Sequence, residues 1–154
     1  MAATPPNVEM DSRFPSGEWA GFFIQPSVSQ RRQRMDLTLT FHSGIFSGEG
    51  RDGVGNFRIR GRYDLQSGEC TFHKHYVGQH SVFYRGWNEG KGIWGTWEIG
   101  IRVVGMSLSD KGGFHIWPKG SGIGLETELT AEADVPEEEE ERVLVGNEKA
   151  GGLG

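Results

Sequence analysis

The chain has 154 residues, which fits a single domain of ordinary size. Its 25 glycines exclude long helices as the main architecture, because each interior glycine costs a helix about 1 kcal/mol relative to alanine. A single cysteine, Cys70, excludes a disulfide scaffold or a thiolate metal cluster within one chain. The sequence shows no signal-peptide pattern and no apolar run near the ~18 residues of a membrane span. We therefore expect a cytoplasmic protein with no membrane partner.

Charge is unevenly distributed along the chain. Residues 1–125 carry 14 Lys and Arg against 11 Asp and Glu, whereas residues 126–154 carry 2 against 10, so the net charge of −5 comes from the C-terminal part. Like charges repel, and this part offers little apolar surface to offset the entropy of ordering. We predict a flexible N-terminal segment over residues 1–16, a β-barrel domain over residues 17–125 and an acidic, mostly disordered tail over residues 126–154.

Between these ends, apolar and polar residues alternate with a period of two, which is typical of half-buried strands. The clearest case is Met35, Leu37, Leu39 and Phe41, which alternate with polar residues. Strands are expected at residues 19–25, 35–41, 45–50, 57–63, 69–77, 80–87, 92–104 and 113–117. Short segments rich in Gly, Ser and Asn separate them, and a further turn is expected at residues 110–113.

Short connections of this kind join antiparallel neighbours, so the expected sheet is a meander. One of its faces is apolar, and no amphipathic helix long enough to cover that face is evident in the sequence. The sheet must therefore close on itself or pair. Eight strands close into a barrel whose interior is filled by side chains or holds one small ligand. We predict an all-β fold, a single eight-stranded antiparallel up-and-down β-barrel.

Short motifs within the predicted strands resemble those of a known group of barrels. These motifs are Gly17-x-Trp19, Gly61-x-Tyr63 and Gly95-x-Trp97. Over residues 17–118 the chain resembles the calycins, which comprise lipocalins, fatty-acid-binding proteins and avidins, and it is most similar to the avidin branch. A longer pattern over residues 48–86 is similar to that of uncharacterised small β-barrel domains. The resemblance implies the barrel fold. It does not imply biotin binding, because the Ser, Thr and Asn set that avidins use is not evident.

The candidate binding residues depend on the turn between two predicted strands, at residues 77–80. A three-residue turn pairs Tyr76 with His80 and places Lys74, Tyr76, His80 and Tyr84 on one side of the sheet, with Trp97 as a further neighbour. If that side faces the interior, rings and a few polar groups surround a small pocket. The ligand-binding residues predicted on this basis are Lys74, Tyr76, His80, Tyr84 and Trp97. The alternative is structural: Lys74 stacks on the tyrosines and binds nothing.

A two-residue turn has a different consequence. It places His73, His75 and His80 on one face, where three imidazoles could hold a metal ion. A metal-dependent barrel enzyme is therefore a third hypothesis for the function, although the sequence favours a non-catalytic protein without a cofactor.

Two basic stripes give the body of the chain a possible partner surface. They consist of Arg31, Arg32 and Arg34, and of Arg58, Arg60 and Arg62. No aromatic residues interleave with the exposed stripe, which argues against a nucleic-acid partner. The alternative to a small-molecule binder is thus a structural or protein-interaction module with a plugged barrel core, which engages partners through its basic face or acidic tail. An oligomer is compatible with either hypothesis.

One motif matches the dinucleotide-binding fingerprint, but the helix that should follow it is not expected here. Residues 48–53 read GEGRDG, which fits G-x-G-x-x-G. That motif binds phosphate only where a helix follows it, and here a strand is expected instead. The interpretation we adopt is a turn in which the Asp52 side chain accepts hydrogen bonds from backbone amides.

Overall fold

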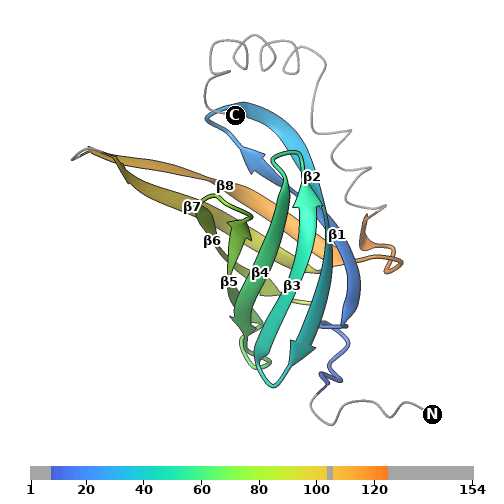
Figure 1. The fold of residues 1–154 in the computed structure, drawn as a ribbon. Helices are drawn as coiled ribbons and strands as arrows, with labels where there is room; N and C mark the ends of the chain where they lie inside the picture. The colour runs from blue at the N-terminus through green and yellow to red at the C-terminus, as the bar shows by residue number, and fades with distance from the viewer. Residues whose placement is uncertain (1–7, 104–105, 125–154) are drawn as a thin grey trace.

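Eight antiparallel strands, joined by short connections, close into one barrel (Figure 1). The computed structural model describes residues 8–103 and 106–124. The strands are β1 (Gly17–Gln25), β2 (Ser29–His42), β3 (Ile45–Asp52), β4 (Asn56–Tyr63), β5 (Glu69–Tyr76), β6 (Ser81–Asn88), β7 (Ile93–Val103) and β8 (Met106–Pro118). Each strand pairs with the next, and β1 pairs with β8 to complete the cylinder. The predicted fold class is confirmed. The predicted acidic tail lies outside the described residues.

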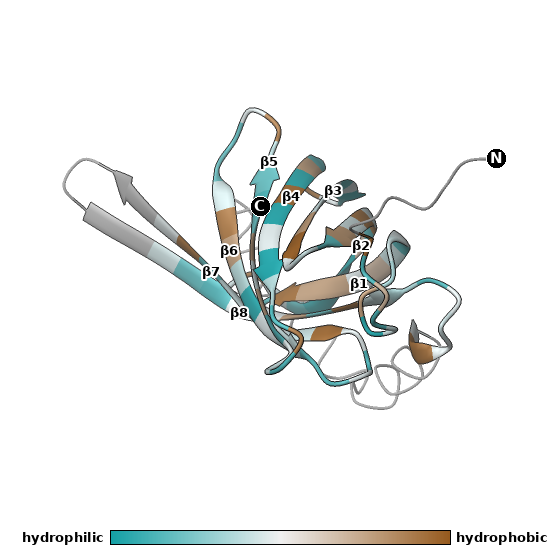
Figure 2. Ribbon diagram, turned by 90° about the horizontal axis from the view of Figure 1, so that it is seen from below, coloured by the Kyte–Doolittle hydropathy of each residue, from teal (hydrophilic) through white to brown (hydrophobic). Residues whose placement is uncertain are grey.

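The apolar side chains of each alternating strand face the barrel interior. On β2 the side chains of Met35, Leu37, Leu39 and Phe41 are buried, and the residues between them are exposed. The same alternation of burial recurs on β4 and β5, and on β4 it is accompanied by the alternating hydropathy coloured in Figure 2. In the part of the chain with described placement, no helix is long and apolar enough to cross a membrane.

Aromatic rings fill one end of the barrel. Phe14, which precedes β1, is fully buried, and its ring centroid lies 4.7 Å from that of Tyr63 and 5.5 Å from that of Phe41. Phe41 in turn stacks on Phe46 at 5.0 Å. The sequence places the barrel boundary at Gly17 and so leaves Phe14 outside it, whereas the structure makes this residue the plug of the barrel.

The segment before β1 is held by polar contacts as well. Val8 forms a backbone bridge with His42, and the Tyr63 hydroxyl donates a 2.6 Å hydrogen bond to Glu9 Oε1. The Arg13 side chain reaches the Leu65 carbonyl oxygen at 2.7 Å. Residues 8–16 therefore pack against the same end of the barrel that Phe14 closes.

β2 and β8 begin several residues earlier than the sequence predicts. β2 begins at Ser29, and β8 begins at Met106. The turn expected at residues 110–113 is wrong, because these residues lie within β8, where Gly112 pairs with Trp97. Gly112 is needed there for close packing: a Cβ atom would overlap the Ile24 carbonyl oxygen and lie 2.7 Å from the Trp97 indole nitrogen. Beyond Glu98 of β7, the two strands pair only with each other and extend away from the barrel (Figure 1).

Candidate functional site

The β5–β6 hairpin has the register of the three-residue turn. His75 pairs with Ser81 and Lys74 with Val82, and the Tyr76 amide donates a 3.3 Å hydrogen bond to the His80 carbonyl oxygen. Lys74 and Tyr76 consequently face the barrel interior, whereas His73 and His75 face outward. The register that the binding hypothesis needs is confirmed, and the two-residue alternative is wrong.

A buried ion pair lies inside the barrel. Lys74 Nζ is 2.8 Å from Asp52 Oδ2, and the two side chains are 1% and 0% exposed. The Tyr76 hydroxyl donates a 2.6 Å hydrogen bond to the same carboxylate oxygen. The other oxygen, Oδ1, accepts hydrogen bonds from the amides of Val54 (2.8 Å) and Gly55 (3.3 Å). Because both carboxylate oxygens have donors, the cost of burying this charge is offset locally.

The contacts of Asp52 depend on its position in β3 and on the turn that follows this strand. Phe46, Gly48, Gly50 and Asp52 alternate on β3, so Asp52 is on the inward side at the end of its strand. The turn to β4 then brings the two backbone amides onto its side chain. The predicted turn cap is confirmed, and the strand that follows, β4, rules out the helix a dinucleotide site would need.

Aromatic rings enclose the ammonium group. Lys74 Nζ lies 4.4 Å from the ring centroid of Phe23, 4.9 Å from that of Phe57, 5.0 Å from that of Tyr76 and 5.2 Å from that of Tyr84. Each ring presents a negative face to a cation, and such contacts strengthen where water is excluded. The structural role that the sequence suggests for Lys74, stacking on the tyrosines, is therefore present in the molecule.

Burial shifts the pKa values of Lys74, Tyr76 and Tyr84. Burial lowers the pKa of Lys74 to about 8, and the nearby Asp52 carboxylate opposes that shift. Burial and the hydrogen bond to Asp52 raise the pKa of Tyr76, and burial raises the pKa of Tyr84. At neutral pH Lys74 is thus mostly an ammonium, and Tyr76 and Tyr84 are neutral phenols.

A small pocket of about 110 Å³ opens beside the ion pair, at the end of the barrel opposite the aromatic plug. The strand order fixes this placement, because Tyr76 pairs with Phe57 at one end of β5, and Cys70 pairs with Tyr63 at the other. The pocket is lined by Phe23, Gln25, Val54, Tyr76, Gln79, His80, Val82, Tyr84, Trp97 and Ile99.

Four of the five predicted binding residues line this pocket: Tyr76, His80, Tyr84 and Trp97. The rings of Tyr76 and His80 lie 5.8 Å apart at their centroids. Lys74 does not line the pocket. It lies behind the wall, against the rings of Phe23, Tyr76 and Tyr84.

The polar groups of the pocket wall differ in whether they have partners. The Trp97 Nε1 donates to the Ile24 carbonyl oxygen at 3.0 Å, and Gln25 Nε2 donates to Asp110 Oδ2 at 2.7 Å. Tyr84 is 1% exposed, yet its hydroxyl has no hydrogen bond to any residue that the structure describes. Buried polar groups are nearly always paired, so the Tyr84 hydroxyl stands out as a group that a ligand could satisfy.

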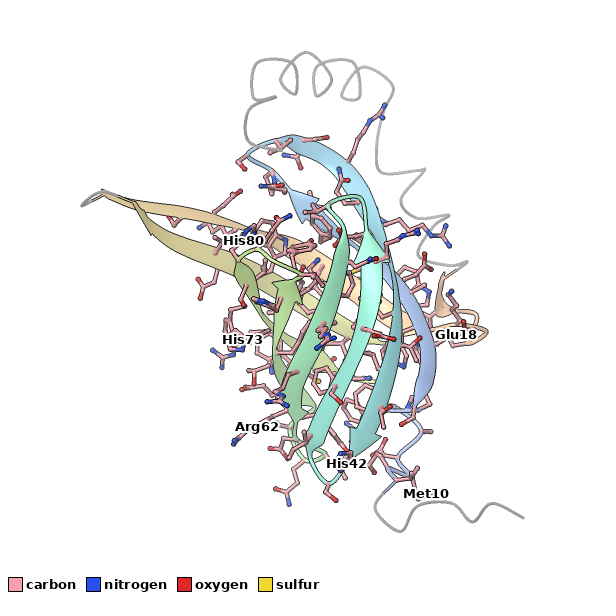
Figure 3. All side chains as sticks on the ribbon, viewed as in Figure 1. Met10, Glu18, His42, Arg62, His73 and His80 are labelled. Carbon is pink, nitrogen blue, oxygen red and sulfur yellow. The ribbon has the colours of Figure 1, made fainter. Side chains whose placement is uncertain are left out.

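The three histidines of the metal hypothesis do not meet. His73 and His75 are exposed on the outer face of β5, and His80 lies at the end of the hairpin beside the pocket (Figure 3). Within residues 8–103 and 106–124, no cluster of three or more His, Cys, Asp or Glu has the geometry to hold a metal ion. His75 Nδ1 does lie 2.7 Å from Ser81 Oγ, but this contact is on the exposed outer face and outside the pocket.

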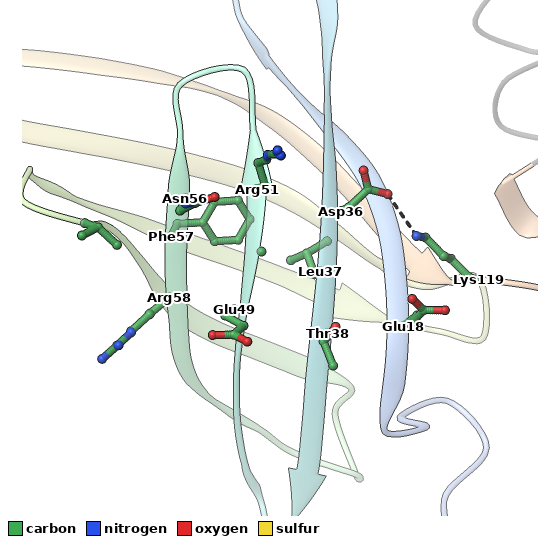
Figure 4. A pocket seen from close by; sticks show the side chains of 12 residues that line it. Glu18, Asp36, Leu37, Thr38, Glu49, Arg51, Asn56, Phe57, Arg58 and Lys119 are labelled. Carbon is green, nitrogen blue, oxygen red and sulfur yellow. Dashed lines mark ion pairs between the residues drawn. The ribbon is translucent and has the colours of Figure 1, made fainter.

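A larger hollow, of about 540 Å³, lies on the outer wall over β2, β3 and β4 (Figure 4). Charged residues of both signs surround it, among them Arg51 and Arg58, and Lys119 Nζ pairs with Asp36 Oδ1 at 3.2 Å. Solvent-exposed charges at the rim bind weakly, so the smaller interior pocket is the stronger candidate site.

Asp52 is the residue of this site whose inward role the sequence prediction missed. The prediction weighed only its turn chemistry. The signal was available: Asp52 shares the parity of Phe46 on the same strand, which places its side chain on the buried side.

Comparison with protein-family models, with curated proteins and with solved structures gives no match for this chain.

Proposed function

We propose that the protein is a non-catalytic β-barrel that binds a small molecule in the pocket at the mouth opposite Phe14. The observation that carries the proposal is Tyr84, a residue of the pocket wall that is 1% exposed and whose hydroxyl has no partner among the described residues. Apolar walls with few convergent polar groups are typical of small-molecule sites. The resemblance of Gly17-x-Trp19 to the entry of calycin barrels supports the same proposal, since such barrels hold ligands in their interiors.

The state of the reactive side chains, Lys74 and Cys70, favours ligand binding over catalysis. Lys74 is held by Asp52 and enclosed by rings, so it is not presented to a ligand as a nucleophile. Cys70 lies at the plugged end of the barrel, and burial raises the pKa of its thiol to about 12. A thiol in that state is inert.

A protein-interaction module is the second candidate, and the packing of the barrel favours it. The pocket is smaller than the ~300 Å³ at which typical ligand pockets begin, and rings fill the rest of the interior. Arg58, Arg60 and Arg62 project from the outer face of β4 and are exposed or partly exposed. This surface could contact an acidic partner protein.

A fragment screen by NMR, with a blocking variant, tests the first candidate. The screen uses compounds of up to about ten heavy atoms and observes the methyl signals of Val82 and Ile99, which line the pocket. We expect some fragments to shift these signals. Ile99→Trp should fill the mouth and abolish the response. Val77→Trp adds the same ring at an exposed position outside the pocket and should leave the response intact.

If no fragment of any charge shifts the two methyl signals, or if Ile99→Trp leaves binding unchanged, the small-molecule function is rejected. Native mass spectrometry of the purified protein adds an independent observation, because it reports a co-purified ligand, a metal ion and the number of subunits together.

A further inference from the structure

We propose that the pocket selects neutral compounds about the size of one ring, with one hydrogen-bonding group that meets the Tyr84 hydroxyl. This inference rests on the proposed binding function and adds the chemical class of the ligand. Three features of the pocket carry it: its size, the charges behind its wall and the unpaired hydroxyl.

Size limits the buried part of the ligand. The pocket measures about 110 Å³. An apolar protein cavity of about 150 Å³ accommodates benzene. The pocket is smaller than that cavity, so it holds at most one ring or a branched group of similar volume, with part of that group in the mouth at the exposed rim. A longer substituent would have to leave through the rim, where Val54, Gln79 and His80 are exposed.

The charges behind the wall disfavour a cationic ligand. Rings arranged around a small space usually attract an ammonium group. Here the chain supplies that ammonium itself, because Lys74 Nζ lies against the rings of Phe23, Tyr76 and Tyr84, which also line the pocket. A second cation in the pocket would share those rings with Lys74 and would lose its water of hydration without gaining a free anion, because Asp52 is already paired.

An anionic ligand is disfavoured as well. The Lys74 charge is already balanced by Asp52 at 2.8 Å. An incoming carboxylate would lose its water of hydration without gaining a free cation, and it would be repelled by the Asp52 carboxylate. A neutral compound avoids both penalties.

The Tyr84 hydroxyl provides the polar contact. The hydroxyl of the neighbouring Tyr76 already donates its hydrogen bond to Asp52. Burial raises the pKa of Tyr84, so its hydroxyl remains protonated and can donate or accept. A neutral ligand with a hydroxyl, carbonyl or amide group would satisfy it, and a purely apolar ring would leave it unpaired.

Four probes that each contain one benzene ring test this selectivity: benzyl alcohol, benzoate, benzylammonium and toluene. Dissociation constants are measured by NMR titration at pH 7, with the Val82 and Ile99 methyl signals as site reporters. We expect benzyl alcohol to bind at least about tenfold more tightly than either charged probe. Tyr84→Phe should weaken benzyl alcohol about fivefold, which corresponds to one hydrogen bond, and should not weaken toluene.

Tyr63→Phe is the matched control, since it removes a hydroxyl at the plugged end, where the partner is Glu9. It should leave all four affinities unchanged. Thermal melts establish that both variants fold, and Tyr84→Phe should fold well because it removes a group without a partner among the described residues.

The inference is overturned if a charged probe binds as tightly as benzyl alcohol, if Tyr84→Phe leaves the benzyl alcohol affinity unchanged, or if none of the four probes shifts the reporter signals. In each of these cases the broader fragment screen still decides the binding function. Fragments that bind there while these probes fail would retain the function and reject only the ligand class.

Discussion

Lys74 Nζ and Asp52 Oδ2 lie 2.8 Å apart inside the barrel, and both side chains are excluded from solvent. The carboxylate comes from the end of β3 and the ammonium from the middle of β5, so the pair joins two strands that do not hydrogen-bond to each other. Two amides and the Tyr76 hydroxyl complete the partners of the carboxylate. The stability of the ligand-side mouth should therefore depend on this pair.

Lys74→Met tests that dependence. The variant keeps the apolar stem but leaves Asp52 buried without its cation, which should cost about 3–5 kcal/mol in the free energy of unfolding. The double variant Lys74→Met/Asp52→Asn removes both charges and should recover part of the loss, because asparagine can still accept the turn amides. Urea denaturation of the four proteins in this cycle measures the coupling. Equal stabilities of the single and double variants would contradict the assignment.

The same pair predicts how stability varies with pH. Burial lowers the pKa of Lys74 from 10.5 to about 8, so between these values the unfolded chain binds a proton that the folded protein has released. Stability contributed by this group is complete above pH 10.5 and is lost as the pH falls through 8. The shift corresponds to roughly 3 kcal/mol.

The measurement compares the unfolding free energies of the unmodified protein and Lys74→Met across this range. Tyrosines and Cys70 titrate alike in both proteins, so their contributions cancel. The difference in favour of the unmodified protein should widen from pH 8 to pH 10.5. A constant or narrowing difference would show that Lys74 does not have a lowered pKa.

The alternating pattern of residues such as Met35, Leu37 and Leu39 was enough to predict the barrel, because side-chain direction in a strand follows directly from sequence parity. The same parity identified Lys74, Tyr76 and Tyr84 as one inward set once the turn register was known. The sequence left that register open between two turn lengths, and one residue in the turn reverses every side chain.

Other features depend on packing between distant segments. Phe14 follows a proline-rich stretch and has no strand periodicity around it, so nothing local marks it as a core residue. Gly112 and Gly113 have the composition of a turn, yet both lie within β8, and Gly112 serves a close approach to Trp97 and Ile24. The size of the pocket depends on how the rings pack, which a pattern of residue types does not specify.

Gly61 should tolerate no side chain. It lies on β4 between Phe46 of β3 and Phe72 of β5, whose rings meet at 5.4 Å. A Cβ atom at Gly61 would overlap the Phe72 Cβ and the Thr71 carbonyl oxygen. Because one of these is backbone, a side-chain rotation cannot relieve the clash. Gly61→Ala should reduce the free energy of unfolding by about 1–3 kcal/mol.

Gly100 provides the matched control for that substitution. It is also a strand glycine, on β7, but a Cβ atom there would meet nothing within 4 Å. Gly100→Ala should leave stability unchanged or raise it by up to about 1 kcal/mol, since alanine restricts the unfolded chain. Urea titrations of both variants give the comparison, and equal effects would argue against the tight β3–β4–β5 packing.

Phe14→Ala tests whether the segment before β1 belongs to the core. The Phe14 ring is 0% exposed and packs on Phe41 and Tyr63. Its removal opens a cavity at the plugged end and should cost about 3–5 kcal/mol. Met10→Ala lies in the same segment, but Met10 is 84% exposed, so that change should stay within about 0.5 kcal/mol. A similarly small effect of Phe14→Ala would place residues 8–16 outside the cooperative unit. Because the pocket is at the other mouth, Phe14→Ala should lower stability while preserving the fragment response of Val82 and Ile99.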